Sequence, residues 1–422
     1  MTNSTPIWYK ESTLWPIPQD WVIVKLWDLW ETFSWLSWKR KHDFWSWKKY
    51  IPYMNIFKWS IIDNNYLDLV LISKWERQNK VCDWDILFTT SSETPHEVWM
   101  CSCYKGSDDN EIYLNSFSFG YRLTEKQRNQ PLYLTYFFRS ELWRKIMYKL
   151  AQWATRYNLS KVNFMKTNLP LPPLPEQKAI ASILSSCDET ITGTQKLIEK
   201  LELRHKTLCQ QLLTGKKRVE GFDGKWKEEK IEKYITYTPR EIVKPKEDYL
   251  ALWVRSHAKW IFQKPDTSTN ENAMDVLFEV KKDDLVMSIT FAWEHAVAIA
   301  REKDDWWLVS HRFPTYIFKE WKATSKFFKY FIKQPRFKYQ LWVISPGGAW
   351  RNRVMSKKDF IKLRITIPNL EEQIAISKIL DESEKEINHT KQKISNLKKI
   401  KKWLMQQLLT WKTRVPKAYL TN

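Results

Sequence analysis

Clusters of lysine, arginine and hydroxyl side chains are the parts of this sequence best suited to chemistry, and that chemistry is contact with phosphate. The segment from 37 to 49 carries Lys39, Arg40, Lys41, Lys48 and Lys49 beside serines. Another cluster contains Thr90, Ser91 and Ser92, whose hydroxyls suit phosphate oxygens or base edges. Each pattern also has an ordinary alternative, since charge runs occur on solvated faces and hydroxyl runs in Ser/Thr turns.

Further basic residues come late in each half of the chain. Arg351 and Arg353 follow a Ser-Pro-Gly-Gly segment whose backbone allows a close approach, and Arg156 and Asn158 hold the corresponding place in the first half. This placement favours contact with nucleic acid over a structural role. The set of DNA-binding candidates is completed by Lys161, Arg255, Lys259 and Lys357.

Catalytic signatures are missing from the sequence. We find no phosphate-binding glycine loop, no H-E-x-x-H, no C-x-x-C, no G-x-S-x-G and no Asn-Pro-Pro-aromatic clamp. Asp275 with Glu279 and Lys281 resembles a nuclease pattern, but the pattern is short and common by chance. The five cysteines lack a usual zinc spacing, so we expect reduced thiols and neither a metal nor a catalytic residue. A stand-alone DNA nuclease or methyltransferase with an unrecognised site is the alternative.

The charge of the chain predicts a polyanionic partner. Lys and Arg number 69 against 48 acidic residues in 422, which gives a formal net charge of +21. Nucleic acid is favoured over a membrane surface, because no apolar run reaches about 18 residues and no secretory leader follows Met1. We therefore expect a cytoplasmic protein that binds double-stranded DNA.

The elements that must position these residues are repeated. Glu176-Gln177 recurs as Glu372-Gln373, and Gln210–Thr214 recurs as Gln406–Thr410, at one constant offset. So long a period excludes a solenoid and indicates two similar halves. Strands are expected near 21–26, 66–72, 85–88 and 284–289, and helices within 131–153 and 327–339.

Each half ends in the same predicted device: a proline-bounded strand, a short helix carrying Glu-Gln, a break near Ser185 or Asp381, and a long helix. Apolar residues on the two long helices alternate at three and four positions, which is typical of a coiled-coil seam. The seam residues are Leu184, Ile191, Ile198, Leu201, Leu208, Leu212, Leu380, Ile387, Ile394, Leu397, Leu404 and Leu408. Thr194, Thr390, His205 and Lys401 interrupt the seam. An amphipathic helix packed on its own domain is the alternative.

These patterns predict a domain order. An N-terminal leader (1–20) without regular structure precedes a first α/β recognition domain (21–170) and a helical region (171–219); a second recognition domain (220–366), a second helical region (367–415) and a tail (416–422) follow. A helix from Asp188 to Leu213 would be about 39 Å long, close to one DNA turn of about 34–36 Å. The helices could therefore act as a ruler between two DNA-reading domains.

Tryptophan and glycine usage is unusual. The chain has 26 Trp and 8 Gly, whereas about 7% Gly is average. Several Trp residues stand among polar turn formers, and Gly215 in the first repeat aligns with Trp411 in the second. We interpret this as a gene whose UGA codons mean glycine, translated as though they meant tryptophan. A protein rich in tryptophan is the alternative.

The assembled features resemble the specificity subunit of type I restriction-modification systems. The resemblance covers nearly the whole chain and depends on Ile17–Trp21, Phe222–Trp226, the two Glu-Gln segments and the paired Gln-Gln-Leu-Leu-Thr-x-Lys-x-Arg-Val endings. It implies an α/β (α+β) fold with two target recognition domains, internal pseudo-twofold symmetry and an antiparallel coiled coil of two conserved helices. It also implies a non-catalytic subunit that binds two modification subunits and restriction subunits. S-adenosylmethionine, ATP and Mg would then be bound by the partners, and no cofactor by this chain.

Overall fold

The chain divides into two compact units. A computed structural model describes residues 9–11, 16–90, 92, 94, 97–107, 111–124, 129–151, 164–269, 274–347 and 353–420. Unit 1 contains Met1–Gln195 and Lys393–Asn422, and unit 2 contains Lys196–Gln392. The first unit is therefore completed by the C-terminal end of the chain.

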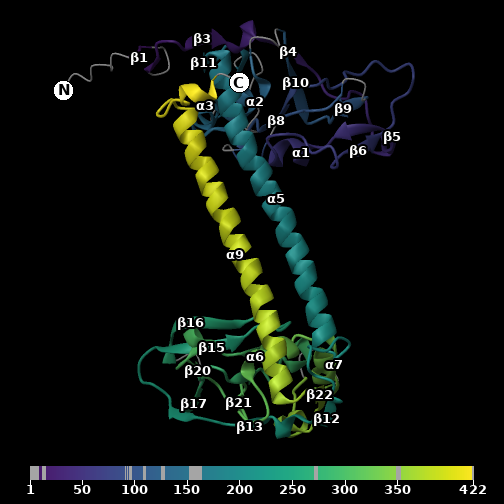
Figure 1. Ribbon diagram of the computed structural model, residues 1–422, viewed down its shortest axis with the longest axis vertical. Helices are drawn as coiled ribbons and strands as arrows, with labels where there is room; N and C mark the ends of the chain where they lie inside the picture. The colour runs from purple at the N-terminus through teal and green to yellow at the C-terminus, as the bar shows by residue number, and fades with distance from the viewer. Residues whose placement is uncertain are drawn as a thin grey trace, which may run out of the picture. The chain divides into compact units, whose positions relative to one another are not determined.

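A four-stranded sheet, β4-β10-β7-β8, forms the centre of unit 1 (Figure 1). Its strands and neighbours are β3 (Val22–Lys25), β4 (Trp30–Phe33), β5 (Phe44–Ile51), α1 (Tyr53–Lys58), β6 (Asp68–Val70), β7 (Ile86–Thr89), β8 (Cys101–Cys103), β9 (Ile112–Leu114), β10 (Ser118–Leu123), α2 (Pro131–Arg139), α3 (Glu141–Ala151) and β11 (Asn168–Leu171). Aromatic side chains of α2 and the sheet fill the core, where Phe88, Phe119 and Phe138 are fully buried. Helix α1 and the sheet β6-β5-β9 form a smaller second core.

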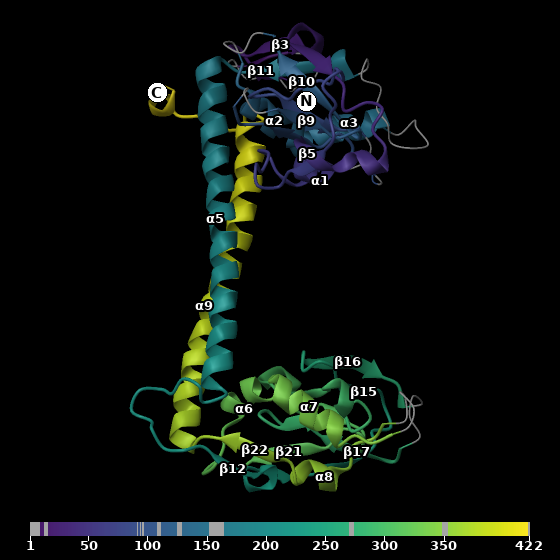
Figure 2. The same cartoon turned by 90° about the vertical axis from the view of Figure 1, so that its right-hand side faces the viewer.

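Unit 2 repeats this plan with a different second layer (Figure 2). Its elements are β12 (Lys227–Lys230), β13 (Ile235–Tyr237), β14 (Glu241–Val243), β15 (Tyr249–Val254), β16 (Ile261–Thr267), β17 (Val276–Glu279), β18 (Leu285–Met287), β19 (Val297–Ile299), β20 (Leu308–Val309), β21 (Thr315–Phe318), α6 (Ser325–Phe331), α7 (Pro335–Val343), α8 (Lys357–Ile361) and β22 (Arg364–Ile367). The sheet β13-β21-β18-β19 corresponds strand for strand to that of unit 1. A five-stranded sheet, β14-β17-β20-β15-β16, takes the place of α1 and β6-β5-β9.

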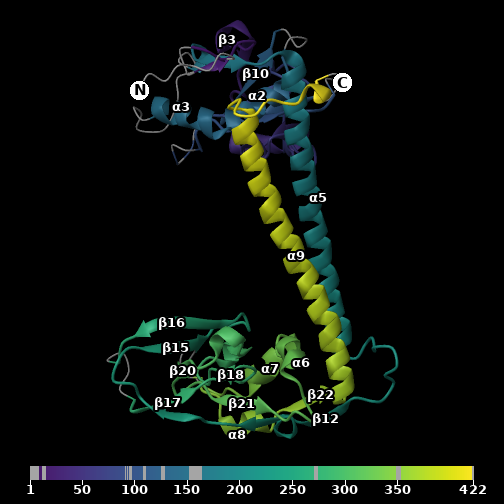
Figure 3. The same cartoon turned by 60° about the vertical axis from the view of Figure 1, so that its left-hand side comes forward.

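Each unit also contains part of two long helices that run in opposite directions (Figure 3). Helices α5 (Leu174–Leu212) and α9 (Leu370–Leu408) have 39 residues each. The expected break near Ser185 or Asp381 is wrong. No proline or glycine stands there, and the local polar groups are satisfied inside the helix, as Thr190 shows by donating to the Ser186 carbonyl at 2.7 Å.

The helical segments before these long helices are each divided in two. Ser140 ends α2 with an extended backbone, and its hydroxyl accepts a hydrogen bond from the Trp143 amide at 3.2 Å, as an N-cap does. Pro335 begins α7, where its missing N–H costs nothing, and so separates α7 from α6. The N-terminal segment is also more regular than expected, because β1 (Tyr9–Lys10) pairs with β2 (Ile17–Pro18).

Positive φ angles occur at unexpected residue types. Among the described residues, ten that are not glycine have φ above zero, and six of them are Trp38, Trp47, Trp84, Trp99, Trp306 and Trp411. This backbone region is unfavourable for bulky side chains but open to glycine. The backbone at these positions thus has the geometry that glycine adopts.

Candidate nucleic-acid interface

The repeated glutamate anchors each unit to the start of a long helix. In unit 1 the carboxylate of Glu176, only 3% exposed, accepts two hydrogen bonds of 2.7 Å from the Arg414 guanidinium and one of 3.2 Å from the Trp21 indole. In unit 2 Glu372 accepts the same three bonds from Arg218 and Trp226. A bidentate arginine–carboxylate pair fixes the relative orientation of the two side chains and also neutralises their charges. We call each set a glutamate clamp.

The neighbouring glutamine holds the helix that follows the central sheet. Gln177 accepts from the Gln130 amide at 2.9 Å and donates to the Pro172 carbonyl. Gln373 accepts from the Thr324 amide and donates to the Pro368 carbonyl at 3.0 Å. Since Gln130 and Thr324 precede α2 and α6, the repeated Glu-Gln pair positions the same helix in both units.

Basic candidates of the segment 37–49 differ in how far they are already neutralised. Lys39 is nearly buried and pairs with Glu76 at 2.5 Å, which holds the pKa of that carboxyl below its usual range. Lys48 pairs with Glu111, and together with Lys80 it lowers the pKa of Glu111 to about 2. Arg40 and Lys49 are exposed. Lys41 lies in a short turn of 3-10 helix. The exposed cations are the ones placed to meet a phosphate.

The hydroxyl candidates are largely committed to the backbone. Thr90 donates to the Phe117 carbonyl at 2.9 Å, and Ser92 accepts from the Thr94 amide at 3.2 Å. These bonds fit the alternative of a Ser/Thr turn. Five other candidates lie outside the described residues: Ser91, Arg156, Asn158, Lys161 and Arg351.

Candidates in unit 2 differ in their contacts. Arg255 is exposed and stacks over Trp260 and Phe262, at 5.6 and 5.0 Å from the ring centroids. Arg353 lies over Trp342, and Lys357 donates to the Tyr237 hydroxyl at 2.9 Å. Lys259 is exposed and borders a cavity described below.

The seam residues are buried or half-buried along both long helices. Eight are buried: Leu184, Ile394 and Leu408 in unit 1, and Ile198, Leu201, Leu212, Leu380 and Ile387 in unit 2. The other four, Ile191, Leu208, Leu397 and Leu404, are half-buried. Thr194 and Thr390 bond back to carbonyls of their own helices.

The other two polar seam positions, Lys401 and His205, each lie beside a tyrosine: Tyr136 of α2 for Lys401 and Tyr330 of α6 for His205. In unit 1 Lys401 pairs with Asp188 at 2.5 Å, and Tyr136 donates to the same carboxylate at 2.8 Å. Burial lowers the pKa of Lys401, and Asp188 offsets part of that effect. In unit 2 Tyr330 donates to Glu384 at 2.9 Å beside His205. These polar contacts fix the position of α2 and α6 against the long helices.

Comparison with known proteins identifies this arrangement. A family model for the type I restriction modification DNA specificity domain matches residues 18–203 and 241–399, which together are more than half of the chain. The chain belongs to this specificity family. It is therefore a DNA-recognition component of a type I restriction-modification system.

Relatives of the specificity family match along nearly their whole length. A candidate type I restriction enzyme MjaX specificity subunit from Methanocaldococcus jannaschii is 26% identical over 96% of this chain and 97% of its own. The S subunit structure from M. genitalium shares 14% identity, covers 92% and 96% of the two chains and has a TM-score of 0.53. The HsdS subunit from Thermoanaerobacter tengcongensis shares 16% identity, covers 94% and 98%, and also has a TM-score of 0.53. The two structures show that the fold is shared.

Sequence reasoning on this specificity chain missed several residues. The clamp arginines lie in the repeated endings, but their partner was not predicted, although the recurrence of both an arginine and a glutamate in the repeat was a usable signal. It also missed the basic residues Lys282, Arg301, Lys326, Lys329 and Lys333, which meet around one cavity in unit 2. Their positions are scattered in the sequence and carry no local pattern. Within the described ranges no cluster of metal-ligating side chains occurs, and no helix is long and apolar enough to span a membrane.

Proposed function

We propose that the two units each read one half of a bipartite DNA target, with this chain as the non-catalytic reader of the complex. One observation carries the proposal: the units share a central sheet and a glutamate clamp but differ in their second layers. A common frame with different covering strands suits two readers of different sequences. The formal charge of +21 supports contact with DNA phosphates. We place this contact in the cytoplasm.

The proposal includes partners that supply the chemistry. Two modification subunits would bind S-adenosylmethionine and methylate adenine, and restriction subunits would use ATP and Mg. The long helices support a docking role, because apolar residues on them remain exposed: Leu203 and Ile374 in unit 2, and Ile400 and Trp403 in unit 1. Ile400 and Trp403 are three residues apart and so lie on one face of α9, and contiguous exposed apolar residues mark protein contacts.

Methylome sequencing of the native host tests the function. We expect a two-part methyladenine motif that disappears when the gene for this chain is deleted and returns with a plasmid copy. The intact complex should bind that motif with an affinity that falls steeply with salt, because phosphate contacts release counterions. Cleavage or methyl transfer by this chain alone would contradict the proposal and favour the stand-alone enzyme.

A further inference from the structure

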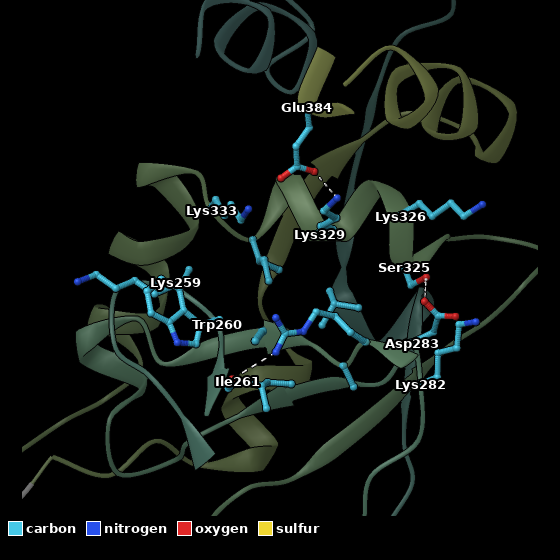
Figure 4. A pocket seen from close by; sticks show the side chains of 16 residues that line it. Lys259, Trp260, Ile261, Lys282, Asp283, Ser325, Lys326, Lys329, Lys333 and Glu384 are labelled. Carbon is cyan, nitrogen blue, oxygen red and sulfur yellow. Dashed lines mark hydrogen bonds and ion pairs between the residues drawn. The ribbon is translucent and has the colours of Figure 1, made fainter. Parts of the chain in front are cut away.

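Unit 2 contains a basic cavity of about 360 Å³ beside α6 (Figure 4). Ala258, Ile261, Ala298, Ile299 and Ala300 form apolar walls, which screen charges less than open water does. The lining also contains six basic and two acidic side chains: Lys259, Lys282, Arg301, Lys326, Lys329, Lys333, Asp283 and Glu384. The cavity therefore carries an excess of positive charge.

Half of these cations have partners inside the unit. Lys329 pairs with Asp381 and Glu384, Lys282 pairs with Glu302, and Arg301 pairs with Asp304 at 2.8 Å. Asp283 accepts a hydrogen bond from Ser325 at 2.7 Å. Among the described residues, no carboxylate lies within ion-pair distance of Lys259, Lys326 or Lys333. Figure 4 shows these three lysines around the cavity, with Lys259 and Lys326 on opposite sides.

The corresponding place in unit 1 is filled by α1. Strands β8 and β19 are equivalent edge strands, so the register places Ser102 where Ala298 lies in unit 2. Ser102 donates to the Ile56 carbonyl at 2.8 Å and thereby holds the end of α1. Ala298 instead lines the cavity. The wall that Ala298 forms in unit 2 is thus covered by α1 in unit 1.

The cation at the end of the neighbouring helix shows the same difference. Arg139, the last residue of α2, donates to the carbonyls of Trp59, Phe57 and Cys101 at 3.0, 3.1 and 2.5 Å. Burial lowers the pKa of this guanidinium. Lys333, just after α6, is exposed; its ammonium lies 5.7 Å from the centroid of the Tyr330 ring and is near enough to Glu384 to lower the pKa of that carboxyl. The positive charge that unit 1 uses for its own backbone is available in unit 2.

We infer that this cavity binds a phosphate group of the target DNA backbone. The inference rests on the proposed function and adds the place on unit 2 that contacts the backbone of the duplex. Lysine ammonium groups on flexible stems can converge on one phosphate without demanding a base sequence. The cavity would fix the position of unit 2 on the DNA, and base readout would be done elsewhere on the unit.

The test replaces Lys259, Lys326 and Lys333 by alanine in the intact complex. Affinity for the methylated motif and for a scrambled duplex is measured between 50 and 300 mM salt. We expect the slope of log K against log salt to become shallower by about one, because the three lysines share one phosphate and each phosphate contact contributes about 0.9. Affinity for both duplexes should fall by the same factor, since phosphates carry no sequence.

Two further measurements show whether the cavity itself holds the DNA phosphate. A control with Lys206, Lys225 and Lys227 replaced by alanine removes the same charge from exposed positions of unit 2 outside the cavity. An equal loss of slope in this control would overturn the inference. So would inorganic phosphate binding that requires the three lysines while the DNA slope stays unchanged. A wild-type complex that does not bind DNA would instead refute the proposed function.

A second inference comes independently from the backbone of the repeats. Gly215 has φ of 69° and Trp411, its equivalent, has φ of 51°. A Cβ at Gly215 would lie 3.4 Å from the Trp226 ring, and the Trp411 ring lies 5.2 Å from that of Trp21. Both positions therefore form the same turn against the tryptophan of a glutamate clamp.

Exposure distinguishes the other positive-φ tryptophans. Trp38 is 98% exposed, Trp47 83% and Trp306 66%, so these indoles bury little of the large area that a tryptophan normally hides. Trp84 is less exposed but also has φ of 66°. Trp99 is left out, because its indole is buried and donates to the Thr90 carbonyl at 3.2 Å. Trp411 is also buried, and glycine is assigned there because the position matches Gly215 and has a positive φ.

The backbone geometry points to glycine at 38, 47, 84, 306 and 411 in the native protein, with UGA as the codon that specifies it. Peptide mass spectrometry on the protein from its host tests this. We expect glycine at these five positions and tryptophan at 21 and 226, whose indoles are used by the clamps. A native peptide with tryptophan at 411 would overturn the inference.

The recombinant chain gives a second measurement. Trp38→Gly should raise the unfolding temperature, because glycine adopts positive φ without strain and the indole at 38 is 98% exposed. Trp21→Gly is the matched control and should lower it, since it removes a buried indole. A lower unfolding temperature for Trp38→Gly would count against glycine at that position.

Discussion

Arg414→Ala is expected to destabilise unit 1 by about 2 to 3 kcal/mol, because it leaves the buried Glu176 carboxylate with only the Trp21 indole as a partner. The value lies toward the low end for a broken buried pair, since the Arg414 side chain is 40% exposed and that of Glu176 is 4% exposed. Amide hydrogen exchange measures the effect unit by unit. Protection should fall in β3 and β11 and remain in unit 2.

Two matched variants show whether the clamp is responsible. Arg218→Ala removes the equivalent arginine and should lower protection in unit 2 alone. Arg204→Ala breaks an exposed pair with Glu386, in which both side chains are about half exposed, and should cost under about 1 kcal/mol. Adding Glu176→Gln to Arg414→Ala should restore part of the loss, since the buried charge is gone. Equal loss in both units after Arg414→Ala would contradict a local clamp.

The repeated segments predicted most of the elements that the two units share, because each pattern depends only on residues close together in the sequence. A strand bounded by proline and a heptad pattern each specify an element within a few residues. Strand β11 and strand β22 accordingly lie where the proline-bounded segments predicted strands, and both long helices follow them. The wrong break near Ser185 had the opposite cause, since polar residues in mid-helix can be satisfied by their own helix.

The clamps could not be read from spacing, because they are made by distant contacts. Arg414 and Glu176 are 238 residues apart, and the pair forms only when the C-terminus returns to unit 1. The basic segment shows the same limit. Lys39 and Arg40 are neighbours in sequence, yet one is paired with Glu76 and the other is exposed. Which cation can reach a phosphate depends on the ion pairs that form in the folded chain. These pairs cannot be read from sequence composition.

Adding one heptad to each long helix is expected to lengthen the spacer of the recognised DNA motif by roughly three base pairs. Helices α5 and α9 are continuous at Gln195–Lys196 and Gln392–Lys393, where the chain passes from one unit to the other. Seven residues extend each helix by about 10.5 Å, and base pairs follow one another at about 3.4 Å. A whole heptad keeps the apolar seam in phase.

Methylome sequencing of a host that carries the lengthened chain with its modification subunits measures the result. Both half-sites should stay the same, because the inserted residues touch neither central sheet, while the spacer between them grows. A variant with the same heptad substituted for native residues, and not inserted, should leave the motif unchanged. The ruler hypothesis requires the change in spacer to follow helix length: an unchanged spacer with full methylation would show that the helices only connect the units.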